Sequence, residues 1–292
     1  MIVKSAFCKY TSLFRQHGIP DASAEARVLI CHVLKVNCAG FFAMLDRHLT
    51  DSEQSIISSL AERRIRGEPS AYIVSRKEFY GIDLFVDNRV LIPRPETELL
   101  VEEVLEYCRG RKGRPLYIAD VGTGSGAMAI ALALNIDSAS IFAIDISAAA
   151  LEVALQNVSH YRLQERVSLL KGNLLSILPQ SVNVVVANLP YVAERDMQGL
   201  PVEVSLYEPG IALSGGRDGT AVINQLLKQV KGKVSPGGIV LLEIGMGQED
   251  KIFKMAKRIA PDYEIVLRED LAGIKRVLKI IIPAFDIDDE LR

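Results

Sequence analysis

The chain has few of the side chains that bind metals or form disulfides. Its 292 residues include four cysteines and four histidines. No two cysteines have the spacing of a metal-ligand or redox motif, so we expect free thiols in a reducing compartment. Cys31 and His32 are adjacent, but neighbouring helix positions point about 100° apart and do not readily share one ion. The sequence therefore predicts no metal site.

Long apolar runs and an excess of positive charge are also lacking. The most apolar stretches, 127–136 and 277–285, are shorter than the ~20 residues that span a bilayer. The first residues have no signal-peptide pattern, and we expect a cytoplasmic protein without a membrane partner. The net charge is -2, from 34 basic and 36 acidic residues. Proteins that read nucleic acids usually carry a basic excess, so we expect no direct nucleic-acid contact. We expect a monomer, but no pattern in the sequence determines the oligomeric state.

The periodicity of apolar residues divides the chain into three parts. Before about residue 72 the pattern is helical, with Asp21 expected to cap one helix and Thr50 to form a capping box with Glu53. Residues 1–75 are therefore predicted to form a small all-α domain. Residues 76–95 have the composition of a β-hairpin followed by a proline-rich linker. Residues 96–292 form the third and largest part.

Strands and helices alternate in this third part, after a loop at 110–115. Helical stretches at 127–134, 148–158 and 220–230 separate most of five candidate strands, which lie at 116–121, 140–144, 167–170, 182–187 and 238–243. This alternation is typical of a doubly wound, mostly parallel α/β sheet. Two last strands, 263–268 and 276–282, are joined by a loop too short for a helical crossover, so we expect them to be antiparallel. No function is assigned to the terminal residues 286–292.

A glycine-rich loop follows the first of these strands. It consists of Asp120, Val121, Gly122, Thr123, Gly124, Ser125 and Gly126. Glycines let the backbone turn sharply and let a ligand approach closely, as in dinucleotide-binding loops. Asp145 ends the next strand, where a carboxylate can accept hydrogen bonds from ribose hydroxyls. The loop alone fits either a dinucleotide or another nucleoside cofactor, and the position of Gly126 favours a nucleoside that carries an amino-acid tail.

The turn Asn188-Leu189-Pro190-Tyr191 closes the fourth strand of the sheet. Pro190 fixes its own φ and restricts Leu189, which directs the Leu189 carbonyl and the Asn188 side-chain oxygen toward one point. Two such acceptors suit the two N–H groups of a planar nitrogen, and the ring of Tyr191 can stack on a flat acceptor group. The turn therefore predicts methyl transfer to an amide or exocyclic amine nitrogen.

Together these motifs resemble the release-factor glutamine methyltransferase family, whose members are class I, Rossmann-like, S-adenosylmethionine-dependent enzymes. The resemblance covers nearly the whole chain. It includes the stretches 66–69, 77–80, 92–98, 120–126, 188–191, 207–209 and 215–219.

The resemblance implies transfer to N5 of the glutamine in the Gly-Gly-Gln motif of class I peptide chain release factors. It implies that the helical domain and hairpin help to hold the release factor, and that the glycine loop and Asp145 hold the cofactor. Asn173 and Leu174 would lie along adenine, Asn188 would touch both ligands, and 188–191 would bind the glutamine amide.

Three residues leave alternatives open within this resemblance. Leu189 stands where the family commonly has a first proline, which keeps the carbonyl but makes the turn less rigid. Asn173 replaces a common acidic residue, and its amide oxygen can still accept from an adenine amino group. Glu208 either lines the site and binds substrate or supports a helix or loop.

Competing functions remain at this stage. A methyltransferase for a ribosomal-protein glutamine or a nucleic-acid amino group would use the same turn chemistry, the latter on a flipped base. A nucleoside-binding module without catalysis would not need Asn188 or Tyr191. A nicotinamide oxidoreductase fits the glycine loop but not the turn.

Overall fold

The structure is a computed structural model that describes residues 1–109, 111 and 115–284. Most of the loop expected at 110–115 and the terminal residues 286–292 lie outside the described residues. The described chain forms two compact units: 1–76 with 201–207, and 77–200 with 208 onward. The short segment 201–207 therefore belongs to the first unit although it interrupts the second in sequence.

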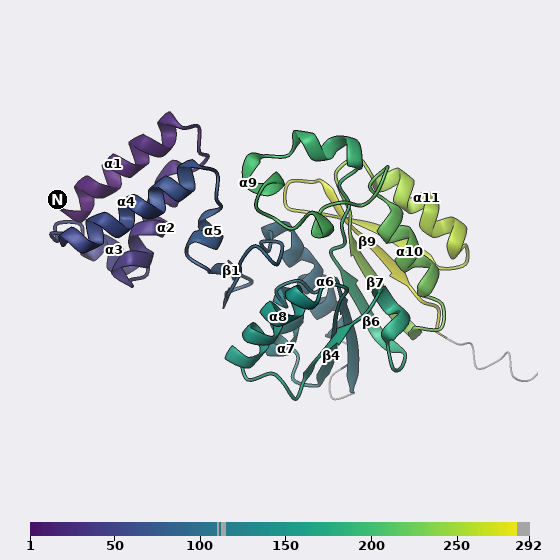
Figure 1. Cartoon of the computed structure of the whole chain (residues 1–292). Coiled ribbons are helices and arrows are strands. Elements are labelled where there is room, and N and C mark those ends of the chain that lie inside the picture. Colours follow the sequence, from purple (N-terminus) through teal and green to yellow (C-terminus); the bar gives the residue numbers. More distant parts are fainter. Residues whose placement is uncertain (110, 112–114, 285–292) are drawn as a thin grey trace, which may run out of the picture. The chain divides into compact units, whose positions relative to one another are not determined.

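The first unit is helical, as the sequence predicts (Figure 1). Its helices are α1 (Val3–Gln16), α2 (Ala22–Leu34), α3 (Cys38–Ala43), α4 (Asp51–Ile65), α5 (Ser70–Ile73) and α9 (Val202–Ser205). Apolar residues at helical spacing bury one stripe of each longer helix, including Tyr10, Phe14, Leu29 and Ile57. Burial of such side chains stabilises the unit by about 1.5–3 kcal/mol each.

Two predicted helix caps in this unit have different outcomes. The capping box at α4 is confirmed: the Glu53 amide donates to Thr50 Oγ1 at 3.2 Å, and the Thr50 amide donates to Glu53 Oε2 at 2.8 Å. The predicted cap at Asp21 is wrong. Asp21 precedes α2 but makes no side-chain capping hydrogen bond, because its backbone is left-handed (φ 48°) rather than extended.

Arg64 fastens segment 201–207 to the helices of this unit. Its guanidinium is buried and donates to Glu25 Oε2 and to Glu203 Oε2, both at 2.7 Å. A buried guanidinium needs paired acceptors, and these two carboxylates come from α2 and α9. The ion pairs therefore account for the membership of this segment in the helical unit.

The second unit contains a seven-stranded sheet of order β5-β4-β3-β6-β7-β9-β8. Its strands are β3 (Leu116–Val121), β4 (Ala139–Asp145), β5 (Val167–Lys171), β6 (Val182–Ala187), β7 (Val234–Glu243), β8 (Glu264–Glu269) and β9 (Lys275–Ile281). Strands β3 to β7 pair in parallel, and β9 pairs antiparallel with both β7 and β8. This confirms the predicted sheet and its antiparallel C-terminal hairpin. A small antiparallel hairpin of β1 (Lys77–Phe79) and β2 (Ile82–Leu84) precedes it.

Helices cover both faces of the sheet (Figure 1). One face packs against α6 (Glu98–Cys108), α7 (Ala127–Asn135) and α8 (Ala148–His160), and the other against α10 (Ala221–Gln229) and α11 (Glu249–Ile259). The remaining elements are 3₁₀ turns at Pro95–Thr97, Leu174–Ile177, Glu194–Gly199 and Gly210–Ala212. The chain runs outward from β3 to β5, then returns to the other side of β3 as β6. The carboxyl ends of β3 and β6 therefore form a topological switch point, where ligands bind in open α/β sheets.

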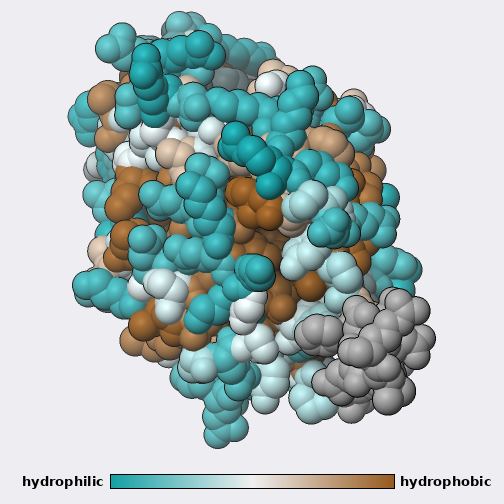
Figure 2. All heavy atoms as spheres, turned by 90° about the vertical axis from the view of Figure 1, so that its right-hand side faces the viewer, coloured by the Kyte–Doolittle hydropathy of each residue, from teal (hydrophilic) through white to brown (hydrophobic). Residues whose placement is uncertain are grey.

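The surface of the molecule is mixed in polarity. Figure 2 shows one face on which hydrophilic side chains predominate, with apolar side chains visible between them. Such mixing is ordinary, because apolar atoms supply more than half of most protein surfaces. No described helix is both long enough and apolar enough to cross a membrane.

Candidate active site

The glycine loop after β3 adopts backbone angles that favour glycine. Gly122, Gly124 and Gly126 have φ of 76°, 55° and 82°. A Cβ added to Gly122 would meet the Leu189 side chain at 3.3 Å and the Asn188 carbonyl oxygen at 3.5 Å. The loop thus lies directly against the turn that follows β6, and a side chain at residue 122 would strain the backbone and crowd that turn.

Asp120 supports this loop through hydrogen bonds to its buried side chain. Its side chain is fully buried, and Oδ2 accepts from Thr123 Oγ1 at 2.7 Å and from the Ala129 amide at 3.1 Å. Burial raises the pKa of Asp120 to about 7, and the hydrogen bonds partly oppose that shift. Asp120 therefore joins the loop to the first turn of α7.

Asp145 lies at the carboxyl end of β4 and is hydrogen-bonded to the glycine loop. Its Oδ2 accepts from the Gly124 amide and its Oδ1 from the Ser147 amide, both at 2.9 Å. Burial raises the pKa of this carboxyl, while the backbone amides of Ser147, Gly124 and Ile146 act in the opposite direction. Each carboxylate oxygen has more than one acceptor site, so Asp145 can also receive hydroxyl donors from a ligand.

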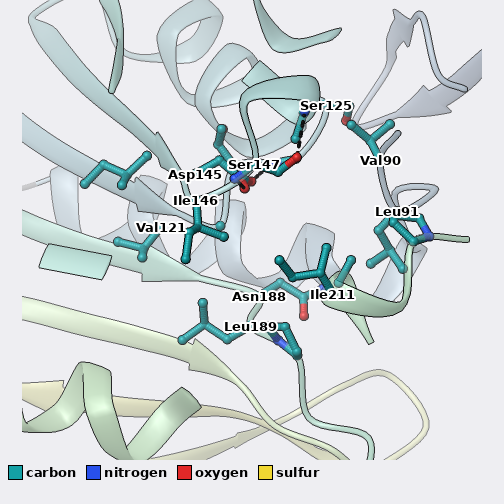
Figure 3. A pocket seen from close by; sticks show the side chains of 18 of the residues that line it. Val90, Leu91, Val121, Ser125, Asp145, Ile146, Ser147, Asn188, Leu189 and Ile211 are labelled. Atoms are coloured by element: carbon teal, nitrogen blue, oxygen red, sulfur yellow. Dashed lines mark hydrogen bonds between the residues drawn. The ribbon is translucent and has the colours of Figure 1, made fainter. Parts of the chain in front are cut away.

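A cavity of about 460 Å³ opens at the switch point. In Figure 3, Asp145, Ile146 and Ser147 lie along one side, Val90 and Leu91 lie opposite, and Asn188 and Leu189 form a further edge. The cavity brings together ten of the predicted site residues, namely Gly122, Thr123, Gly124, Ser125, Asp145, Asn173, Leu174, Asn188, Leu189 and Pro190. Residues from the carboxyl ends of four strands, β3, β4, β5 and β6, thus meet at one place.

Four predicted site residues lie outside this lining: Asp120, Gly126, Tyr191 and Glu208. Asp120 is buried beside the loop through its bonds to Thr123 and Ala129, and Gly126 is the N-cap residue just before α7. The Tyr191 hydroxyl is directed to Glu243 Oε1 at 3.5 Å, and burial together with Glu243 raises the pKa of Tyr191 to about 12.

Glu208 does not line the cavity itself but pairs with Arg94, which does. Its side chain is 1% exposed, and Oε1 accepts from Arg94 Nη2 at 2.5 Å. Arg94 lines the cavity. This arrangement matches the loop-supporting alternative, because Glu208 holds a lining side chain in place.

The orientation of Asn188 depends on two side chains that the sequence did not indicate. Asn188 Nδ2 donates to Thr97 Oγ1 at 2.9 Å, and Thr97 Oγ1 donates to Glu243 Oε2 at 2.7 Å. Thr97 belongs to the stretch 92–98 that resembles the family, but no pattern in the sequence assigned it a role of its own. Glu243 ends β7. The available sequence signal was a polar residue at the end of an otherwise apolar strand, at Glu243, and one next to a helix start, at Thr97.

The linker before α6 supplies the apolar wall of the cavity. Val90, Leu91 and Pro93 line it, together with Met128 from α7 and Ile211 from the later 3₁₀ turn. These lining residues were also missed, because apolar side chains near a site cannot be distinguished from core residues in one sequence. Among the described residues no group of three or more His, Cys, Asp and Glu side chains is arranged to hold a metal ion.

The arrangement suits a nucleoside ligand at one end and a small polar group at the other. Asp145 and the loop amides offer hydrogen bonds at the end of β4, and Asn188 and Leu189 offer acceptors at the end of β6. Apolar residues between them exclude water, which strengthens electrostatic interactions inside the cavity.

Two family models match the chain. Residues 6–74 match the model described as PrmC N-terminal domain. Residues 95–194 match the model described as ribosomal protein L11 methyltransferase (PrmA).

Curated relatives match over most of their length. A protein of Bradyrhizobium diazoefficiens named release factor glutamine methyltransferase is 34% identical over 277 residues, which is 94% of this chain and 93% of the relative. A protein of the same name from Coxiella burnetii is 38% identical over 256 residues, or 87% and 90% of the two chains. Among solved structures, a methyltransferase from Pyrococcus furiosus is similar with a TM-score of 0.50 and 16% identity, covering 77% of this chain and 99% of that one. At this identity the structure supports the fold alone.

Proposed function

Because this chain belongs to the release factor glutamine methyltransferase family and has a class I methyltransferase fold, we propose that it methylates class I peptide chain release factors. The acceptor is the side-chain amide nitrogen, N5, of the glutamine in their Gly-Gly-Gln motif. The methyl donor is S-adenosylmethionine. The membership confirms the resemblance inferred from the sequence, and with it an enzymatic function.

One observation supports the proposal: residues predicted to bind a nucleoside and residues predicted to bind an amide line one cavity. Asp145 and the glycine loop lie at one end, and Asn188 with Leu189 at the other. Methyl transfer between a nucleoside cofactor and an amide needs this juxtaposition, because donor and acceptor must meet in line.

The residues present fit S-adenosylmethionine. Gly122 lines the cavity at a positive φ, and a Cβ there would crowd the Leu189 side chain on the acceptor side. Asp145 would accept from the ribose hydroxyls, the loop from Gly122 to Gly126 would hold the amino-acid tail, and Asn173 with Leu174 would lie along adenine. Asp120 would act through Thr123, to which it is bonded. When bound, the cofactor supplies an electrophilic methyl group on a positively charged sulfur.

The turn after β6 would bind and orient the acceptor. An amide nitrogen is a weak nucleophile because its lone pair is delocalised. Asn188 Oδ1 and the Leu189 carbonyl would accept its two N–H bonds and leave the lone pair facing the methyl group. Orientation of this kind supplies about 7–11 kcal/mol of a barrier. No strong base is required, since the nitrogen becomes acidic once it is methylated.

Electrostatics at the cavity wall also suit a cationic donor. Arg89 and Arg94 both line the cavity. Arg89 pairs with Asp87 and Glu152. Arg94 pairs with the buried carboxylate of Glu208 at 2.5 Å. The pair reduces the repulsion that a lone guanidinium would exert on a sulfonium. Glu208 would thus act on substrate binding indirectly, through Arg94.

We further propose that the helical unit and the hairpin help to hold the release factor, and that Tyr191 completes the acceptor site when substrate binds. A cytoplasmic monomer without a nucleic-acid or membrane partner is part of the same proposal. Size-exclusion chromatography with light scattering tests the monomer directly.

The deciding assay uses purified enzyme, labelled S-adenosylmethionine and a class I release factor. Parallel acceptors are the release factor with its Gly-Gly-Gln glutamine changed to alanine, ribosomal proteins, and transfer RNA. Label on the unchanged release factor alone supports the proposal. Equal labelling of the alanine variant, or preferential labelling of a ribosomal protein or RNA, overturns it.

A further inference from the structure

Three side chains from separate parts of the second unit form one hydrogen-bonded row. Asn188 follows β6, Thr97 ends the 3₁₀ turn Pro95–Thr97, and Glu243 ends β7. The row runs from Asn188 Nδ2 to Thr97 Oγ1 at 2.9 Å and on to Glu243 Oε2 at 2.7 Å. Thr97 and Glu243 are 5% and 3% exposed, so solvent does not compete for these bonds.

The chemistry of the row fixes its direction. A carboxylate only accepts hydrogen bonds, so the single hydroxyl hydrogen of Thr97 must point to Glu243. Thr97 Oγ1 then has only lone pairs to offer to Asn188. The NH₂ end of the Asn188 amide fits there, and its oxygen end does not. Asn188 Oδ1 is therefore turned away from Thr97, toward the cavity that Asn188 lines.

The opposite orientation of Asn188 would defeat the acceptor site. The two ends of a carboxamide have nearly the same shape, so packing alone distinguishes them poorly. A flipped Asn188 would present N–H groups to the N–H groups of a primary amide. A repulsive contact would then replace an attractive one at the reacting nitrogen.

Two hydroxyl donors and Arg276 favour the role of Glu243 as an acceptor, against the effect of burial. Burial raises the pKa of Glu243, and Glu96 adds to this shift, whereas Thr97, Arg276 and Tyr191 oppose it. Both carboxylate oxygens face hydroxyl donors, Thr97 on Oε2 and Tyr191 on Oε1. Burying a carboxylate costs folding free energy. Here Thr97 links the buried carboxylate of Glu243 to Asn188, which lines the cavity.

We propose that Thr97 and Glu243 are positioning residues that lock the Asn188 amide with its oxygen toward the acceptor. They thereby select acceptor groups that donate two N–H bonds. This inference rests on the proposed function, since it assigns the orientation of the group that binds the glutamine amide.

Two pairs of variants test the row. Thr97→Val removes the hydroxyl at nearly constant shape, and Thr97→Ser keeps it. Glu243→Met removes the acceptor and frees Thr97 to donate to Asn188, whereas Glu243→Gln keeps an oxygen that can still accept. Glu103→Met is the matched control, because Glu103 is also a buried carboxylate but pairs with Arg268 and Lys279, which are not among the residues lining the cavity.

The readouts are kcat and KM for the release factor, the Kd of S-adenosylmethionine by calorimetry, and Tm. We expect Thr97→Val and Glu243→Met to lower kcat about tenfold to hundredfold, which is less than the factor of about 10²–10³ typical of losing one oriented group, because both act through Asn188. Their cofactor Kd changes less than about threefold, and Thr97→Ser and Glu243→Gln retain most of the kcat. Glu103→Met lowers Tm but leaves kcat near that of the wild type below its Tm.

Each contrary outcome is informative. Wild-type kcat in Thr97→Val and Glu243→Met overturns the inference while the proposed function stands. The inference is also overturned if cofactor affinity falls as much as kcat. The same holds if Thr97→Ser and Glu243→Gln lose as much kcat as Thr97→Val and Glu243→Met. If Thr97→Val does not fold, the Met and Gln variants of Glu243 decide the question. An inactive wild type in the same assay counts against the proposed function instead.

Discussion

Asn157 donates from its side-chain Nδ2 to the carbonyl oxygen of Ser125 at 2.9 Å, which ties helix α8 to the glycine loop. The same amide donates to the Phe85 carbonyl at 2.9 Å and accepts from the Phe85 amide at 2.8 Å. Asn157 is 2% exposed. One buried side chain therefore joins the segment after β2 to the loop that lines the cavity.

Asn157→Ala is expected to weaken cofactor binding. The change leaves three backbone groups without their partner, one buried at Ser125 and two partly buried at Phe85. A buried unsatisfied group costs about 1–3 kcal/mol. We expect a Kd for S-adenosylmethionine about tenfold higher or more, together with a lower Tm. Calorimetry measures the first and thermal unfolding the second. Asn135→Ala is the control, because the exposed Asn135 bonds only the Ala131 carbonyl of its own helix. An unchanged Kd in Asn157→Ala would show that the loop does not depend on this bond.

Asp120→Asn is expected to make stability less dependent on pH. The pKa of Asp120 is raised from an ordinary value of 3.8 to about 7, because the carboxyl is buried. A raised pKa favours folding while the group stays protonated, and this advantage is lost as the pH rises through about 7. The wild type should therefore lose stability relative to Asp120→Asn between about pH 4 and pH 7. Denaturant unfolding of both proteins across this range tests it, and parallel curves would contradict the assigned shift.

Asn188→Ala is expected to abolish most transfer while preserving much of the cofactor binding. The variant removes one of two acceptors that orient the amide nitrogen, for which a loss of about 10²–10³ in kcat is typical. Asp145 and the glycine loop remain, so the Kd of S-adenosylmethionine should change much less than kcat. Single-turnover transfer and calorimetry separate the two effects. Turnover at the wild-type rate would remove Asn188 from the mechanism.

Glu208→Gln is expected to discriminate between the cofactor and its product. The variant leaves the Arg94 guanidinium at the cavity without its paired carboxylate. Repulsion should then weaken cationic S-adenosylmethionine more than neutral S-adenosylhomocysteine, by about threefold to tenfold in the ratio of their Kd values. The double variant Arg94→Met with Glu208→Gln should restore the ratio. Equal weakening of both ligands would assign Glu208 a purely structural role.

The sequence was sufficient wherever one local pattern determined the outcome. The glycine loop, the turn at 188–191 and the seven strands were predicted because their signals lie within a few adjacent residues. The antiparallel pair β8 and β9 followed from a short loop, which admits no helical crossover.

What the sequence could not provide were relationships between distant residues. Thr97 and Glu243 are 146 positions apart, and their hydrogen bond exists only because the 3₁₀ turn packs against the end of β7. The pairing of Arg64 with Glu203, which draws 201–207 into the helical unit, is equally long-range. The predicted cap at Asp21 is wrong for another reason, because the left-handed backbone of Asp21 excludes the capping geometry that its side chain suggested.

The proposed acceptor is the amide nitrogen of one release-factor glutamine. Tandem mass spectrometry of a release factor treated with this enzyme and S-adenosylmethionine tests it most directly. We predict a single added methyl group on the glutamine of the Gly-Gly-Gln peptide, located on its side chain, and none when Asn188→Ala replaces the wild type. A methyl group found on another residue, or an unmodified Gly-Gly-Gln peptide after full cofactor turnover, would contradict the account.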